Sequence, residues 1–312
     1  MKFRLLPFLM LTFCAALIFT SCKKDSSSGS TNPNSDAQVQ SDDQAQVSAD
    51  VDAISNDAEG AIGAESSMNG RVLNWEGCNA VAVADTTGDT KKITITYNGA
   101  DCFSARTRTG VIVISMNKGV HWKDEGAVVT ISIQNLKITR LWGNKKSITI
   151  NGTKTITNVS GGTLFDLLST KDQIVHDVNS DGITVTFDNG KERTWKLAIR
   201  RTIELDNGQA VITEEGTHTD GAVSGIAVWG TNRFGNAFSW VIAAPLVVRQ
   251  DCNWRLVSGA AVHTGVLGVA TTTFGLDANG EATSCPGTGT YYFKTVFVSA
   301  SDSKQYTFIL PY

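Results

Sequence analysis

Acidic residues that stand side by side are the first candidates for catalysis in this chain. Asp124-Glu125 and Glu214-Glu215 have the residue types of a glycosidase, which uses two carboxyl groups for acid–base or nucleophilic work. Neighbouring residues on a strand point to opposite faces, however, so neither pair makes a site by itself. The sequence also lacks a Gly-x-Ser-x-Gly motif, a phosphate-binding loop and a His-Glu-x-x-His motif. We therefore expect no catalytic residue and no cofactor, with a hydrolase of unrecognised residues as an alternative.

Cysteines offer a second kind of chemistry. Two of the six lie within the first 22 residues, which leaves Cys78, Cys102, Cys252 and Cys285. Four cysteines in an exported chain favour disulfides and allow three connectivities. We favour Cys78–Cys102 and Cys252–Cys285, because each pair brackets a strand-turn-strand segment. A metal site is the alternative, but no pair has Cys-x-x-Cys spacing, and the histidines stand in unrelated contexts at His121, His176, His218 and His263.

Cys22 stands at the end of an export signal. Lys2 and Arg4 precede an apolar run, Leu5 to Phe19, that is too short to span a bilayer comfortably. The following Thr20-Ser21-Cys22 resembles a bacterial lipobox, in which a cysteine thiol takes up a diacylglycerol. This resemblance implies a signal peptide over residues 1–21, lipidation of Cys22 and acylation, for example with palmitate, of the new amino terminus. A short membrane anchor is the alternative.

Two tryptophans lie between predicted strands and are candidate ligand contacts. Trp122 and Trp142 each follow a strand pattern, and an indole in a turn can stack on a sugar ring or on a partner protein. The alternative is that each one caps the end of the core. Consecutive turns of an antiparallel meander lie at opposite ends of the sheet, so we predict more than ~25 Å between the two indoles. Trp195 and Trp240 share their parity with aliphatic residues and are predicted to be core.

The segments before the predicted strands are polar and then helical in pattern. Residues 22–46 contain few large apolar residues and predict a flexible tether. Residues 47–66 predict a short helix packed on the domain, because apolar residues recur at helical spacing at Val47, Val51, Ile54, Ala58 and Ile62. Acidic residues are expected on the other faces of this helix, at Asp50, Asp52, Asp57 and Glu59.

From residue 71 onward the apolar period changes to two. The clearest alternating segments are Ile93–Tyr97, Ile131–Ile138, Ile183–Phe187, Trp195–Leu205 and Tyr306–Leu310, with a register slip at Asn135. Thr, Ser, Lys and Arg fill the opposite parity, which predicts antiparallel sheets with one buried and one wet face. We therefore predict an all-β domain over residues 71–312, an antiparallel meander forming a sandwich or an open-barrel-like structure.

Asn-Gly and Asp-Gly pairs punctuate the strand patterns and predict tight hairpin turns. These pairs occur at Asn98-Gly99, Asn151-Gly152, Asp181-Gly182, Asn189-Gly190, Asn207-Gly208 and Asn279-Gly280. Only three prolines lie in the same region, as long strand ladders require.

Several short motifs together resemble uncharacterised lipoproteins of Bacteroidetes-type bacteria. The chain has a Ser-Cys-Lys-Lys-Asp head at residues 21–25, a Gly-x-x-Cys element at Gly99 and Cys102, and a Cys-x-Trp…Ser-Gly segment from Cys252 to Gly259. The resemblance implies an envelope address and a Thr/Gly-rich antiparallel β domain. It implies no particular activity.

Composition and charge narrow the function further. Removal of residues 1–21 takes away two of the 27 basic residues, so 25 face 30 acidic residues and the net charge is −5. Such a surface has no basic patch for nucleic acid. We expect an envelope lipoprotein anchored by its lipid, in the outer membrane, that acts as a non-catalytic binding module for a glycan or a protein. A structural or assembly lipoprotein is the second hypothesis.

Overall fold

The computed structural model describes the β domain nearly throughout and part of the N-terminal region. The described residues are 79–101, 106–141, 146–252, 254–285 and 290–312, together with positions 43, 47, 50, 51, 53–55, 57, 58 and 60–62. Cys22, Cys78, Cys102 and Trp142 therefore lie outside the described residues, as do Asp52 and Glu59. None of the helices in the described part of the chain is long and apolar enough to cross a membrane.

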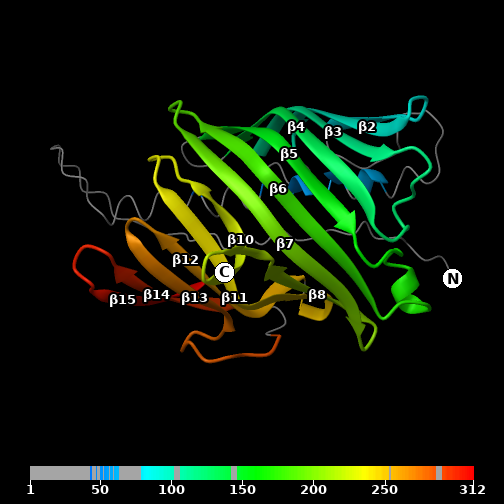
Figure 1. Cartoon of the computed structure of the whole chain (residues 1–312). Helices are drawn as coiled ribbons and strands as arrows, with labels where there is room; N and C mark the ends of the chain where they lie inside the picture. The colour runs from blue at the N-terminus through cyan, green and yellow to red at the C-terminus, as the bar shows by residue number, and fades with distance from the viewer. Residues whose placement is uncertain are drawn as a thin grey trace.

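The chain forms one antiparallel sheet of fifteen strands (Figure 1). The first half contains β1 (Ala80–Asp85), β2 (Thr90–Ala100), β3 (Arg106–Asn117), β4 (Ala127–Arg140), β5 (Ser147–Asn158), β6 (Gln173–Phe187) and β7 (Glu192–Asp206). The second half contains β8 (Gln209–Gly216), β9 (His218–Asp220), β10 (Val223–Thr231), β11 (Ala237–Arg249), β12 (Arg255–Gly265), β13 (Gly268–Leu276), β14 (Tyr292–Ser299) and β15 (Gln305–Pro311). Two short 3₁₀ turns, η1 (Asp166–Leu168) and η2 (Gln250–Cys252), complete the described elements.

The strand order is a meander with one branch. Consecutive strands pair from β1 to β7 and from β10 to β15, which confirms the predicted all-β, antiparallel architecture. At the branch, β8 pairs with both β7 and β11, while β10 pairs with other stretches of the same two strands. In Figure 1 the strands of both halves run obliquely across the view, and the N-terminal helical residues lie behind the strands of the first half. The sheet is an open-barrel-like layer, since no pairing joins β1 to β15 among the described residues.

Alternation of residue types decides which face of the sheet is buried. On β3, Ile112 and Ile114 point inward and are almost fully buried, while Val111 and Val113 between them are partly exposed. Inward residues of strands in both halves join this main apolar core. A smaller separate cluster contains Leu167, Ile174, Ile203 and Ile212. The outer face is rich in threonine and serine, as the opposite parity predicts.

Three Gly-containing pairs that the sequence predicted as turns lie inside strands instead. Gly99, Gly152 and Gly182 belong to β2, β5 and β6, so this part of the prediction was wrong. The reason is close approach between strands: a Cβ on Gly152 would lie 2.7 Å from the Gly182 carbonyl oxygen, and the register of β5 with β6 shifts just beyond. The pairs ending in Gly190, Gly208 and Gly280 do form turns. The predicted slip at Asn135 is confirmed as a register shift of β4 against β5.

The described residues between positions 43 and 62 are helical and pack on the inner face of the sheet. Val47, Val51, Ile54 and Ala58 are buried in the same core as the strands, as their spacing predicted. Asp43, which the sequence analysis assigned to the tether, is already helical. We call these described residues the inner helix.

Two acidic residues of the inner helix lie where the sequence did not place them. Asp50 is buried, and Asp57 is half-buried rather than solvated on an outer face. Both face arginines of the sheet: Arg106 pairs with Asp50, and Arg108 lies 2.6 Å from Asp57. These two ion pairs with strand arginines explain why the carboxylates lie on the sheet-facing side of the helix.

Candidate functional site

One acid of each sequence-predicted acidic pair has a local hydrogen-bond or ion-pair partner. Asp124 accepts a hydrogen bond from the main-chain N–H of His121 at 2.7 Å, and this bond lowers the pKa of Asp124. Glu214 bonds Arg201 at 2.6 Å on the sheet surface. Asp124 and Glu214 therefore each have a structural role in their surroundings.

Trp122 caps the core instead of standing free. Its ring is partly buried against the main core and lies 5.1 Å from the ring of His176. Its carbonyl oxygen accepts a hydrogen bond from the Asn158 side chain at 2.8 Å. These contacts agree with the structural alternative for Trp122. Trp142 lies outside the described residues, so the predicted separation of the two indoles stays a prediction; the strands β3, β4 and β5 do pair antiparallel in sequence order.

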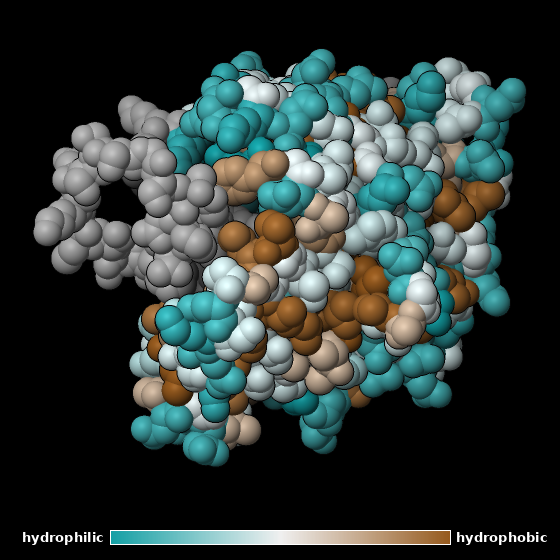
Figure 2. Space-filling model, turned by 60° about the vertical axis from the view of Figure 1, so that its left-hand side comes forward, coloured by the Kyte–Doolittle hydropathy of each residue, from teal (hydrophilic) through white to brown (hydrophobic). Residues whose placement is uncertain are grey.

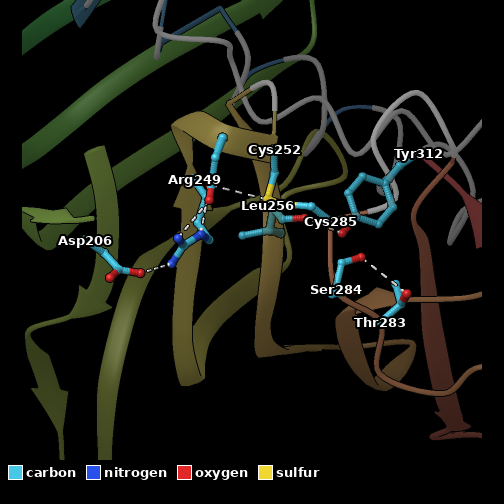
Figure 3. The surroundings of a disulfide bond; sticks show 9 residues. Asp206, Arg249, Cys252, Leu256, Thr283, Ser284, Cys285 and Tyr312 are labelled. Atoms are coloured by element: carbon cyan, nitrogen blue, oxygen red, sulfur yellow. Dashed lines mark hydrogen bonds and ion pairs between the residues drawn. A yellow bond between two sulfur atoms is a disulfide. The ribbon is translucent and has the colours of Figure 1, made fainter. Parts of the chain in front are cut away.

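A disulfide joins Cys252 to Cys285, as the sequence pairing predicted (Figure 3). The two Cα atoms lie 5.2 Å apart. Asp251 stands beside the two sulfurs, in the arrangement of a three-ligand metal site. The disulfide bond removes both sulfurs as thiolate ligands, so this group is structural. Cys78 and Cys102 lie outside the described residues.

Polar contacts fix the chain around this disulfide (Figure 3). Arg249 bridges Asp206 at 2.8 Å and Asp251 at 2.9 Å. The Tyr312 hydroxyl donates to the Leu256 carbonyl oxygen at 2.7 Å and accepts from the N–H of Gly275 at 2.9 Å. The C-terminal residue is thereby locked to β12 and β13, and this region serves the fold.

The strongest candidate for ligand contact is a surface that the sequence analysis did not single out. His218 on β9 stacks on Trp229 of β10, with ring centroids 3.9 Å apart and planes 7° from parallel. Both rings are partly exposed. Trp229 faces outward because Val228 before it points into the core. We name this the His218–Trp229 surface.

Polar side chains surround these two rings on the wet face of the sheet. Lys196 and Ser239 flank Trp229 as its cross-strand partners, and Lys196 is exposed. The hydroxyls of Thr194 and Thr231 lie 2.8 Å apart on the same face. Together they offer an ammonium group and three hydroxyls beside an aromatic platform.

Backbone geometry brings β7 and β10 together at this surface. Gly230 has a φ of 153°, and a Cβ there would lie 2.3 Å from the Thr194 carbonyl oxygen. Only glycine allows this approach, so the two threonine hydroxyls meet. The period of two does not reveal this site in the sequence, because Ile226, Ala227 and Val228 are buried in succession where the register of β10 shifts.

A second exposed surface lies on the outer face of β13 and β14. Val269 and Val298 are cross-strand partners, exposed by 38% and 39% respectively. Figure 2 turns the side that carries β13–β15 toward the viewer and shows hydrophobic residues gathered between hydrophilic margins. Tyr306 on the terminal strand β15 is also exposed.

Comparison of the chain with protein families, with curated proteins and with solved structures found no match. Function must therefore be inferred from the residues and their geometry.

Proposed function

We propose that this protein is a lipid-anchored envelope protein whose β domain binds a glycan at the His218–Trp229 surface. The stacked rings carry this proposal. An aromatic ring exposed on a flat sheet offers an apolar face to the C–H groups of a sugar, while its surroundings bond the hydroxyls. Lys196, Thr194 and Ser239 supply those polar groups within one strand spacing of Trp229.

The anchor at Cys22 belongs to the same proposal. The lipobox-like segment implies a membrane-bound amino terminus, and residues 23–42 are polar enough to hold the β domain away from lipid headgroups. A glycan-binding face on a tethered domain would be displayed toward polysaccharide or glycoprotein near that membrane.

Trp229→Ala tests the glycan site. A glycan array probed with the full chain should show selective binding, and the variant should lose at least tenfold in affinity for the same glycans. Val83→Ala is the matched control, because Val83 is exposed by 46% on the distant strand β1. Equal binding by Trp229→Ala and the parent protein would remove this surface as the site.

A partner protein is the second candidate ligand, and the Val269–Val298 pair favours it. Exposed apolar patches on a folded surface commonly mark protein contacts. A structural or assembly lipoprotein would use such a patch against another envelope component. In a pull-down from envelope extract, Val269→Lys together with Val298→Lys should lose specific partners that Trp229→Ala retains.

A further inference from the structure

The inner helix carries three aspartates spaced by seven residues, and each one meets a cation of the sheet. Asp43 pairs with Arg233, Asp50 with Arg106, and Asp57 with Arg108. Seven residues are about two helical turns, so the three carboxylates lie along one side of the helix. All three cations come from the sheet or its loops, and Arg106 also pairs with Asp101, which follows β2, at 3.1 Å.

Further buried polar contacts join the inner helix to the sheet between these ion pairs. The Tyr97 hydroxyl donates to Asp57 at 2.6 Å, and Lys154, almost fully buried, donates to the Val51 carbonyl oxygen at 3.2 Å and to the Ser55 hydroxyl. A buried ion pair gains little net stability, because both charges lose their water. Such pairs fix the position of a docked element more than they strengthen it.

The inner face beneath the helix changes character along its length. On β3 the inward residues run from Arg106 and Arg108 to Ile112, Ile114 and Met116. The cationic end pairs with Asp50 and Asp57, and Ile62 of the inner helix lies at the apolar end beside Ile114 and Met116. A small cavity remains at that apolar end, lined by Ile62, Lys91, Ile93, Ile114, Met116 and Val129. We call this inner face the trough.

We propose that the trough is a binding site for an anionic amphiphile, with its head on Arg106 and Arg108 and its acyl chain toward Met116. The inner helix is then a resident competitor, because it already sets carboxylates against these two arginines and apolar residues against the apolar part of the trough. Eight residues of extended strand separate Arg108 from Met116, or about 27 Å. One acyl chain, which spans about half of a ~30 Å hydrocarbon core, fits within that length.

Competition predicts how affinity should respond to the helix. A site open in only a fraction of the molecules binds with an apparent affinity reduced by that fraction. Asp57→Asn removes one helix carboxylate and leaves Arg108 in the trough, so it should raise the affinity for palmitate at least tenfold. Asp57→Asn with Arg108→Gln loosens the helix in the same way but removes the head contact, and should lose that gain.

The binding experiment uses the full chain with Cys22→Ser, so that no acyl group on that residue competes with the probe. Palmitate binding is measured by calorimetry on the parent and on both variants. Asp177→Asn is the matched control, because it breaks an Asp–Arg pair with Arg200 on the outer face. Its affinity should equal that of the parent. Equal affinities for the parent and Asp57→Asn, or no saturable binding to either, would overturn the proposal.

Three further probes identify the ligand chemistry. Lysophosphatidic acid should bind like palmitate, since a phosphate can replace the carboxylate. Hexadecanol should bind at least tenfold more weakly; equal binding would remove the role of the arginines. Inorganic phosphate should fail to compete, and competition at similar concentration would reduce the site to a simple anion site.

Hydrogen exchange tests displacement without any variant. Saturating palmitate should speed amide exchange across residues 43–62 while the strands stay protected. Unchanged exchange in the helix would place the ligand elsewhere and overturn the competition. The trough inference goes beyond glycan binding and does not depend on it: Trp229→Ala should bind palmitate normally, so the two proposals fail separately.

Discussion

Single charged residues determine how the inner helix sits on the sheet. Asp50 is buried, and burial raises its pKa to about 6, although the attraction of Arg106 opposes that rise. Burial also raises the pKa of Asp43 beside Arg233. The ion pairs of these desolvated carboxylates fix the position of the helix on the sheet. Because the pKa values of the carboxylates are shifted, the free energy of unfolding depends on pH.

The raised pKa of Asp50 predicts a stability change between neutral and acidic pH. Because the pKa of Asp50 is higher in the folded than in the unfolded state, the folded protein binds this proton more tightly. Protonation of Asp50 therefore raises the free energy of unfolding at low pH, and this stabilisation is lost as the pH rises through about 6. Relative to Asp50→Asn, the parent should gain on the order of 3 kcal/mol in unfolding free energy from pH 7 to pH 4. Urea unfolding at several pH values measures the gap. Parallel curves for the two proteins would contradict the prediction.

Burial of the inner helix could be predicted from the sequence, whereas its ion pairs could not. The apolar stripe of the helix was predictable from its spacing, and all five of its residues are buried as expected. The ion pairs were not, because the partners Arg106 and Arg108 stand about fifty residues away along the chain. Recurrence of aspartate at positions 43, 50 and 57 was the available local signal.

At the scale of elements, glycine had two roles that look alike in sequence. Asn207-Gly208 makes a tight turn, whereas Asn151-Gly152 lies inside a strand where two backbones approach closely. Both glycines have a positive φ, and Gly152 additionally has no room for a Cβ beside the Gly182 carbonyl oxygen. The difference lies in the neighbouring strand, which local sequence does not contain. The strands themselves were predictable, since each repeats its period over many residues.

The disulfide between η2 and the segment before β14 should stabilise the second half of the sheet. It closes a loop with a sequence separation of 33. In the chain-entropy account, a loop of that size contributes about 4 kcal/mol. Cys252→Ser with Cys285→Ser should therefore lower the unfolding free energy by roughly that amount, as measured by denaturant unfolding without reductant. A loss below about 1 kcal/mol would show that Tyr312 and its contacts hold this region without the bond.

The second predicted disulfide, Cys78–Cys102, can be tested directly. The described neighbours of the two cysteines lie close together: the Asn79 side chain donates to the Ala100 carbonyl oxygen at 2.8 Å. Mass spectrometry of a non-reduced digest should find a peptide pair linked through Cys78 and Cys102. Free thiols at both positions, or a link from either to Cys252 or Cys285, would show that the pairing is wrong.

At the scale of the whole molecule, the sheet is open and its two faces have different uses. The inner face holds a helix through charges, and the outer face displays the His218–Trp229 surface and the Val269–Val298 pair. Residues of β10–β14 share the core that contains the inner helix, and Asp43 of that helix pairs with Arg233 between β10 and β11. An architecture of this kind would suit the display and binding that we propose.

Lipidation of Cys22 can be tested on protein isolated from the cell that makes it. Cleavage before Cys22 and acylation of that residue should give a mature amino terminus heavier than Cys22 by a diacylglycerol and one further acyl chain. Two or more chains hold a protein firmly on a bilayer, whereas one holds it only marginally. Cys22→Ser should therefore move the protein from the membrane fraction to the soluble fraction and leave its β-sheet circular dichroism unchanged. Mass spectrometry of the mature amino terminus measures the modification. An unmodified Cys22, or a membrane-bound Cys22→Ser protein, would contradict anchoring through a lipid on Cys22.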